Sequence, residues 1–122
     1  MKQILVVDDD PTIRELVSEV LAAVGYRVRE AQDGLEAMDR LADGCPDLII
    51  TDVNMPVIDG GTLVGIMRAR EDTKHAPVLG ITALTDLRRA NDAYFTHVIH
   101  KPFDIDDLVR TVDRLLEQSP HA

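Results

Sequence analysis

Short aliphatic runs alternate with amphipathic helical segments along the whole chain, and this alternation narrows the possible folds more than any other feature. Val, Leu and Ile dominate the runs at 4–7, 48–50 and 77–81, which lack the polar alternation of a half-exposed strand. Such runs are typical of strands buried on both faces of a parallel sheet. Two further strands are predicted at 26–31 and 98–99, and a helical pattern follows each strand.

Strict alternation of five strands with five helices predicts a doubly wound α/β domain with right-handed crossovers, the flavodoxin-like arrangement. The expected strand order is 2-1-3-4-5, which places the first and third strands side by side where the winding reverses. At 122 residues the chain can form one core but not two, so a single domain over 1–122 is expected. Its core would extend from about 3 to 117, and 118–122 would form a frayed tail.

Charge and cysteine content limit the partners and the compartment. The net charge of -9 would repel nucleic acid and anionic membranes, so neither is an expected direct partner. The single cysteine, Cys45, excludes an internal disulfide and a multi-cysteine metal site. The apolar stretch near the amino terminus is too short for a signal peptide, and no run approaches membrane-spanning length. We therefore expect a cytoplasmic protein.

Polar side chains follow four of the predicted strands at the point where each strand ends. They are Asp8 and Asp9 after the first strand, Asp52 after the third, Thr82 after the fourth and Lys101 after the fifth. The carboxyl ends of parallel strands meet at one edge of the sheet, where open α/β sheets bind ligands. Asp10 has a separate explanation, because with Pro11 at the first helical position it forms an N-cap.

The residue types at this edge indicate a phosphoryl-transfer site. Three converging carboxylates would repel one another unless a hard divalent cation lay among them, and oxygen ligands suit Mg²⁺, or Mn²⁺ in its place. A carboxylate beside that cation and an ammonium group can attack phosphorus, because both cations neutralise the transferring phosphoryl oxygens. A nearby hydroxyl can then hydrogen-bond the new group. The predicted product is an aspartyl phosphate at Asp52.

The same residues belong to motifs whose order and spacing are specific. These motifs are Val6-Val7-Asp8-Asp9-Asp10-Pro11, Asp52-Val53-Asn54-Met55-Pro56 with Asp59-Gly60, Thr82-Ala83, and Lys101-Pro102-Phe103. Together they resemble the receiver domain of two-component response regulators, in the chemotaxis-Y-like superfamily, from residue 4 to about 116. The resemblance implies that Asp52 is the phosphoacceptor. It also implies that Asp9, Asp52 and the backbone carbonyl of Asn54 ligate the cation, with Asp8 acting through a bound water.

The resemblance assigns the remaining site residues to the phosphoryl group and the switch. Lys101 would pair with the phosphoryl group, Thr82 would report its presence, and Ala83 would be small so that the group can be reached. The Lys101–Pro102 bond would be cis. This chain departs from the family at Val98, where receivers commonly have a Tyr or Phe that turns inward with the threonine. We therefore expect switching to rely on the predicted polar helix at 85–93 and the loop that follows it.

The implied function is a signalling domain that catalyses its own phosphorylation and dephosphorylation, not a conventional enzyme. A histidine kinase or histidine phosphotransfer protein would supply the phosphoryl group. An output partner or effector domain would respond, with homodimerisation on phosphorylation as a further response. The sequence is compatible both with a stand-alone receiver and with the receiver of a larger regulator.

Two alternatives remain open at this point. Asp8-x-Asp10-x-Thr12 matches the nucleophile motif of haloacid-dehalogenase-like phosphatases, which also form aspartyl phosphates after a first strand. Against this reading, Asp10-Pro11 is explained as a helix start, and the chain has little room for a substrate-selecting cap. The second alternative is an inactive receiver fold used only for binding, which fits poorly with a complete set of acids, threonine and lysine.

Overall fold

A five-stranded parallel sheet forms the centre of the computed structural model, which describes residues 1–53, 55, 58–83 and 95–118. The strand order is β2-β1-β3-β4-β5, so the predicted order is confirmed. The strands are β1 (Gln3–Val7), β2 (Arg27–Ala31), β3 (Leu48–Asp52), β4 (Val78–Ala83) and β5 (His97–Lys101). Strand β2 and strand β5 form the edges, and every neighbouring pair is parallel.

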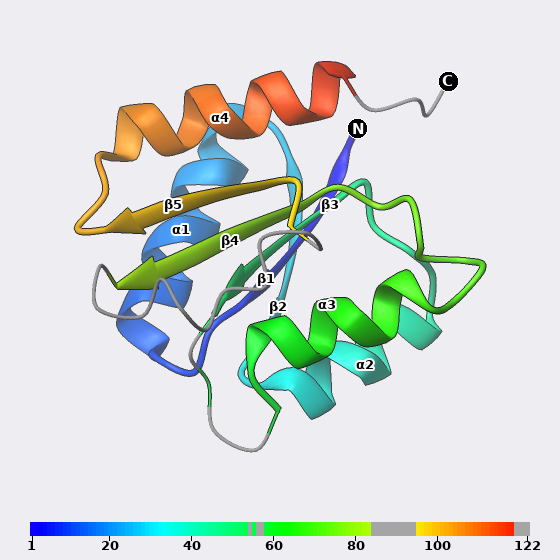
Figure 1. Cartoon of the computed structure of the whole chain (residues 1–122). Coiled ribbons are helices and arrows are strands. Elements are labelled where there is room, and N and C mark those ends of the chain that lie inside the picture. The colour runs from blue at the N-terminus through cyan, green and yellow to red at the C-terminus, as the bar shows by residue number, and fades with distance from the viewer. Residues whose placement is uncertain (54, 56–57, 84–94, 119–122) are drawn as a thin grey trace.

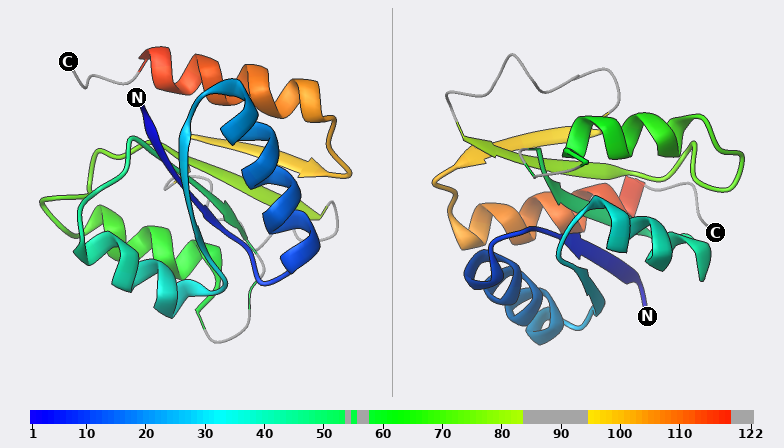
Figure 2. Two further views of the ribbon diagram at one scale, coloured as in Figure 1. Left: turned by 180° about the vertical axis from the view of Figure 1, so that it is seen from behind. Right: turned by 90° about the horizontal axis from the view of Figure 1, so that it is seen from below.

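Helices cover both faces of this sheet (Figures 1 and 2). The helices α1 (Pro11–Val24) and α4 (Ile105–Gln118) lie on one face, and α2 (Gly34–Ala42) and α3 (Gly60–Arg68) lie on the other. The fifth predicted helix, at 85–93, lies outside the described residues. Helix α4 extends through Gln118, the first residue of the predicted tail, and the rest of that tail is also outside the described residues.

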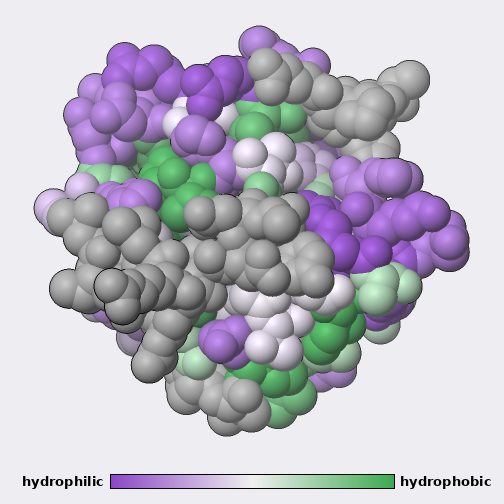
Figure 3. Space-filling model, viewed as in Figure 1, coloured by the Kyte–Doolittle hydropathy of each residue, from purple (hydrophilic) through white to green (hydrophobic). Residues whose placement is uncertain are grey.

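Two hydrophobic clusters hold the layers together, one on each face of the sheet. Alternate residues of one strand enter different clusters: Leu5 and Val7 pack toward α2 and α3, whereas Ile4 and Val6 pack toward α1 and α4. This division is why the strands are aliphatic at every position. Figure 3 shows hydrophilic side chains gathered over α4. The exposed positions of that helix include Asp106, Asp107, Arg110, Arg114 and Glu117.

Aspartates precede all four described helices and fix where each starts. Asp10 accepts from the amide of Thr12, Asp33 from that of Glu36, Asp59 from that of Thr62, and Asp104 from that of Asp106. These bonds satisfy amides that have no partner within the helix. The predicted cap at Asp10 is therefore confirmed. Gly25 ends α1 with φ of 116°, a left-handed conformation that glycine adopts without strain.

The structure extends several of the predicted strands at their carboxyl ends. Strand β4 runs to Ala83, two residues beyond the predicted 77–81, so Thr82 lies within the strand. Strand β5 is longer than the predicted 98–99, because pairing with β4 continues through Lys101.

Candidate functional site

Strand register brings the predicted residues to one edge of the sheet. Val7 pairs with Thr51, so Asp8 and Asp9, which follow β1, lie beside Asp52 at the end of β3. On the other side of β3, Asp52 pairs with Ile81, and Thr82 comes next along β4. The final pair of the sheet joins Ala83 to Lys101. The carboxyl ends of four strands therefore surround one point, as the strand order predicts.

Asp8, Asp9 and Asp52 form a compact acidic cluster. One carboxylate oxygen from each lies within 4.8 Å of the others. Asp8 is 2% exposed and Asp52 is 6% exposed, whereas Asp9 is open to solvent. Charges of one sign at this separation interact unfavourably, and burial increases the cost. The cluster therefore favours the binding of positive charge.

The pKa of Asp8 is shifted by burial and by the neighbouring charges. It is raised from 3.8 to about 6, mainly by burial. The backbone amide of Asp10, which donates to Asp8 Oδ1 at 2.9 Å, opposes this rise. The charge of Asp52 adds to the rise, and that of Lys101 opposes it. Near neutral pH the carboxylate of Asp8 is thus ionised in surroundings that favour its protonated form, and a bound cation would relieve the strain.

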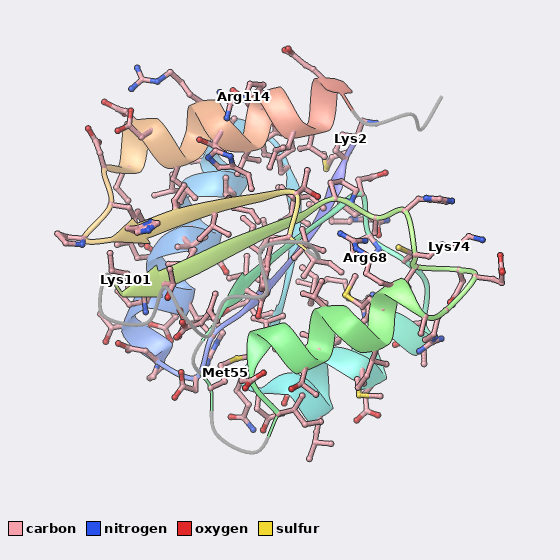
Figure 4. All side chains as sticks on the ribbon, viewed as in Figure 1. Lys2, Met55, Arg68, Lys74, Lys101 and Arg114 are labelled. Atoms are coloured by element: carbon pink, nitrogen blue, oxygen red, sulfur yellow. The ribbon has the colours of Figure 1, made fainter. Side chains whose placement is uncertain are left out.

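Lys101 supplies one positive charge at the site. Its Nζ lies 3.4 Å from Asp52 Oδ2, and its side chain is 30% exposed. Figure 4 shows Lys101 at the edge of the sheet where strands β4 and β5 end. The ammonium group therefore reaches the same carboxylate that would carry a phosphoryl group. The peptide bond that follows, Lys101–Pro102, is cis, as the motif implied.

Glycine at position 60 allows α3 to begin directly against the end of β3. A Cβ atom there would lie 2.4 Å from the carbonyl oxygen of Asp52 and 2.9 Å from Val53 Cα, both backbone atoms. The amide of Gly60 donates to Val53 O at 2.9 Å, and the amide of Val53 donates to Ile81 O at 2.8 Å. The peptide that carries Asp52 is therefore held between β4 and the first turn of α3.

Arg14 is a residue that the motifs did not single out, although it contacts the site. Its Nη1 donates to the carbonyl oxygen of Asp8 at 2.8 Å, and its Nε lies 3.2 Å from Glu30 Oε1 on β2. The amide of Asp8 in turn donates to Ala31 O. These contacts fix the main chain of Asp8 from two sides. The sequence does hold one signal for Arg14. It places a positive charge in the first turn of α1, where the helix dipole favours an acidic residue.

The other predicted site residues have different outcomes. Thr82 is fully buried at the end of β4, beside its cross-strand partner His100. Ala83 is the last residue of β4. Val98 is partly buried and packs against the cluster on the α2 and α3 face. Asn54 lies outside the described residues. The structure thus brings together Asp8, Asp9, Asp52 and Lys101.

The donor set fits a small hard cation. Carboxylate oxygens are the ligands that Mg²⁺ prefers, and an open side at Asp9 leaves room for the waters that Mg²⁺ retains. The same oxygens would accept Mn²⁺. The arrangement of acids, ammonium group and buried hydroxyl is that of a site that accepts a phosphoryl group on a carboxylate.

Comparison with known proteins agrees with this geometry. The family described as the response regulator receiver domain matches residues 4–113, and the chain belongs to that family. It is a receiver domain of two-component signal transduction. Among curated proteins it is similar to the chemotaxis protein CheY-3 of Vibrio cholerae, with 38% identity over 120 residues that cover 95% of this chain and 92% of that protein.

Two further relatives differ in length and in what they contain. The DNA-binding dual master transcriptional regulator RpaA of Synechocystis is 36% identical over 98% of this chain, which spans only 51% of that longer protein. Response regulator TrrA of Thermotoga maritima, solved in complex with Mg²⁺ and BeF, has a TM-score of 0.85 and 35% identity. The match covers 94% of this chain and 99% of TrrA. A neighbour with the same fold therefore binds Mg²⁺.

Within the described residues, no helix has the length and apolar content needed to cross a bilayer.

The structure weakens the phosphatase alternative, because Asp10, one of the two acids of that motif, is exposed and caps α1.

Proposed function

We propose that Asp52 is the phosphoacceptor of this receiver domain, and that 1–122 forms one receiver unit. The observation that carries the proposal is the convergence of three carboxylates with the Lys101 ammonium group at the end of β3. Asp8, Asp9, Asp52 and the carbonyl of Asn54 would hold Mg²⁺ or Mn²⁺, with Asp8 acting through water. The bound cation supplies charge that offsets the repulsion between the carboxylates and an incoming phosphoryl group.

The proposed reaction transfers a phosphoryl group from a phosphohistidine. A carboxylate oxygen of Asp52 attacks phosphorus, an O–P bond forms, and the P–N bond breaks as the imidazole leaves with its electron pair. Lys101, already 3.4 Å from Asp52, neutralises charge on the transferred group. The hydroxyl of Thr82 hydrogen-bonds the product, and the small side chain of Ala83 leaves the group accessible. Water later hydrolyses the acyl phosphate, so the domain completes its cycle without a further enzyme.

An apolar hollow beside Lys101 is the proposed contact surface for the phosphodonor protein. Its volume is about 420 Å³ and it lies between α1 and the segment that joins β5 to α4. The lining residues are Ile13, Leu16, Lys101, Pro102, Phe103 and Ile105. Leu16 is 41% exposed, so its side chain is accessible to a partner that binds at this hollow. A helical histidine kinase or phosphotransfer protein bound there would place its phosphohistidine near Asp52.

The wider setting follows from the same chemistry. Phosphohistidine donors are made from ATP, which supports a cytoplasmic location. Phosphorylation adds negative charge beside Thr82 and would select a second conformation that an output partner, an effector domain or a second copy recognises. The net charge of -9 supports a chain that does not itself contact nucleic acid or anionic membrane.

Incubation with acetyl phosphate and Mg²⁺, followed by mass spectrometry of the intact protein, tests the assignment. We expect one added phosphoryl group in wild type, none in Asp52→Asn, and a wild-type result for Asp39→Asn, whose carboxylate is exposed on α2. A phosphoryl group on any residue other than Asp52 would overturn the assignment. A Mg²⁺ titration without response, together with no modification, would instead support an inactive receiver.

A further inference from the structure

Phe95, which precedes β5, occupies space that belongs to a neighbouring strand. It is 7% exposed. A Cβ atom built on Gly80 of β4 would lie 2.7 Å from Phe95 Cδ1 and 2.8 Å from Phe95 Cε1. Those distances are too short for any side chain, so the ring fills the volume that a residue at position 80 would otherwise occupy. Gly80 and Phe95 are therefore matched in size, because a larger residue at position 80 would force the Phe95 ring to move.

The volume shared by Gly80 and Phe95 borders the residue after Asp52. The Cβ position on Gly80 is 3.4 Å from Val53 Cγ2, and Val53 and Phe95 belong to the same buried cluster. Val53 is 1% exposed, and both its amide and its carbonyl are engaged, by Ile81 and Gly60 respectively. Val53 therefore links the volume shared by Gly80 and Phe95 to the peptide bond that joins Val53 to Asp52.

Phe95 is also held firmly at its own position. The amide of the next residue, Thr96, donates to Val78 O at 2.9 Å. The amide of Val78 donates back to Thr96 Oγ1 at 2.9 Å. This reciprocal pair ties the chain beside Phe95 to the start of β4, two residues before Gly80. The hydrogen bonds between Thr96 and Val78 therefore fix the backbone position from which the Phe95 ring reaches Gly80.

We propose that Phe95 is a positioning residue for the phosphorylation site. Its ring fills the space that a side chain at position 80 of β4 would occupy, and it packs in the same cluster as Val53. In this way the ring fixes the orientation of the Asp52 carboxylate at the end of β3. The inference rests on the proposed role of Asp52 in cation binding and phosphorylation. It assigns a function in the site to a residue that contacts neither the cation nor the phosphoryl group.

Removal of the Phe95 ring should weaken Mg²⁺ binding, because the Asp52 carboxylate would no longer be held in the orientation that binds the cation. We expect Phe95→Ala to raise the Kd for Mg²⁺ about tenfold, the lower end of the usual effect when a residue that orients ligands is lost. Phosphorylation by acetyl phosphate at a fixed Mg²⁺ concentration below this Kd should slow in parallel. Phe95→Ala/Gly80→Met, which returns the lost volume from β4, should recover affinity to within about twofold of wild type, since volume-conserving exchanges are tolerated best.

The control variant creates a cavity of similar kind in the core on the α1 and α4 face, away from Phe95. Leu21→Ala removes a fully buried side chain of α1 that packs in the other cluster. It should lower stability without altering the Kd for Mg²⁺, measured by calorimetry, or the amide chemical shifts of Asp52 and Val53. In Phe95→Ala those shifts should move. If Phe95→Ala does not fold, Phe95→Leu replaces it, with a smaller effect of the same sign.

The outcomes separate this inference from the proposed function. A folded Phe95→Ala with wild-type Mg²⁺ affinity and unchanged Asp52 and Val53 amide shifts would overturn the positioning role, even if wild type is phosphorylated on Asp52. Equal changes in Leu21→Ala would also overturn it. If wild type bound no Mg²⁺, the proposed function would fail, and the amide shifts would still decide whether Phe95 positions Asp52.

Discussion

The two faces of the sheet are built differently. On the α1 and α4 face, aliphatic side chains pack against one another and leave a hollow beside Lys101. On the α2 and α3 face, three glycines allow close approaches: Gly34 to Ile58, Gly60 to the backbone of Asp52, and Gly80 to Phe95. Gly60 meets the backbone of Asp52 and Val53, and the Cβ position of Gly80 lies 3.4 Å from Val53 Cγ2. Under the proposals above, the α2 and α3 face positions Asp52 and the α1 and α4 face offers a contact surface, while Arg14 of α1 holds the main chain of Asp8.

The largest effect that would sharpen this contrast is expected from Gly60→Ala. The new methyl group would lie 2.4 Å from the carbonyl oxygen of Asp52, so α3 must move away from the end of β3. We expect a loss of about 1–3 kcal/mol in the free energy of unfolding. Phosphorylation by acetyl phosphate should be abolished, as measured by mass spectrometry.

A neighbouring glycine gives the matched control for that variant. Gly61→Ala adds the same methyl group one residue further into α3 and should keep phosphorylation, since alanine favours a helix over glycine. Normal phosphorylation of Gly60→Ala would remove the basis for assigning site geometry to the α2 and α3 face.

A smaller effect concerns Asp8, which follows β1 at the edge of the sheet that carries the acidic cluster. Its pKa is raised from 3.8 to about 6, so its contribution to stability is fully present below pH 3.8 and is lost as the pH rises through 6. In EDTA at pH 7.5, Asp8→Asn should therefore be more stable than wild type by about 1–3 kcal/mol. Urea denaturation measures this difference, which should shrink at pH 5.

Magnesium should reverse the ranking of those two proteins. Saturating Mg²⁺ stabilises wild type by binding only its folded state, and it should stabilise Asp8→Asn much less. Asp39→Asn, with an exposed carboxylate, should follow wild type in both buffers. Equal stability of wild type and Asp8→Asn in EDTA at both pH values would show that burial of this carboxylate has no energetic consequence.

The smallest expected effect concerns the hollow on the α1 and α4 face. Leu16→Asp places a charge on its lining, and we expect about a tenfold slower phosphoryl transfer from a phosphohistidine protein, equivalent to about 1.4 kcal/mol. The rate from acetyl phosphate, which needs no docking, should be unchanged. Glu15→Gln, an exposed neighbour on α1, is the control. Equal slowing with both donors would mean that this face shapes the site after all.

The sequence predicted the parts of the site that depend on strand order. Aliphatic runs identified the central strands, and the order 2-1-3-4-5 then placed Asp8, Asp9 and Asp52 together, because carboxyl ends of parallel strands share an edge. The cap at Asp10 was predictable because its partner, the amide of Thr12, is two residues away. Local chemistry and topology were sufficient for these features.

Features that depend on packing between distant segments were not predictable. Arg14 reaches Glu30 across two elements, and Phe95 fills a space that exists only because Gly80 lacks a side chain. The pattern also drew attention to the absence of an aromatic at Val98, while a buried ring three residues earlier, at Phe95, went unnoticed.

The unequal burial of the three acids has a consequence for timing. Asp8 and Asp52 are enclosed while Asp9 remains open to solvent, so an ion can arrive and depart on that side without any opening of the fold. The fraction of molecules with a cation bound at the acidic cluster would then follow changes in the free Mg²⁺ concentration without delay. Under the proposed chemistry, the receiver's readiness to take a phosphoryl group is set by the ionic medium, whereas its shape is set in advance by the sheet.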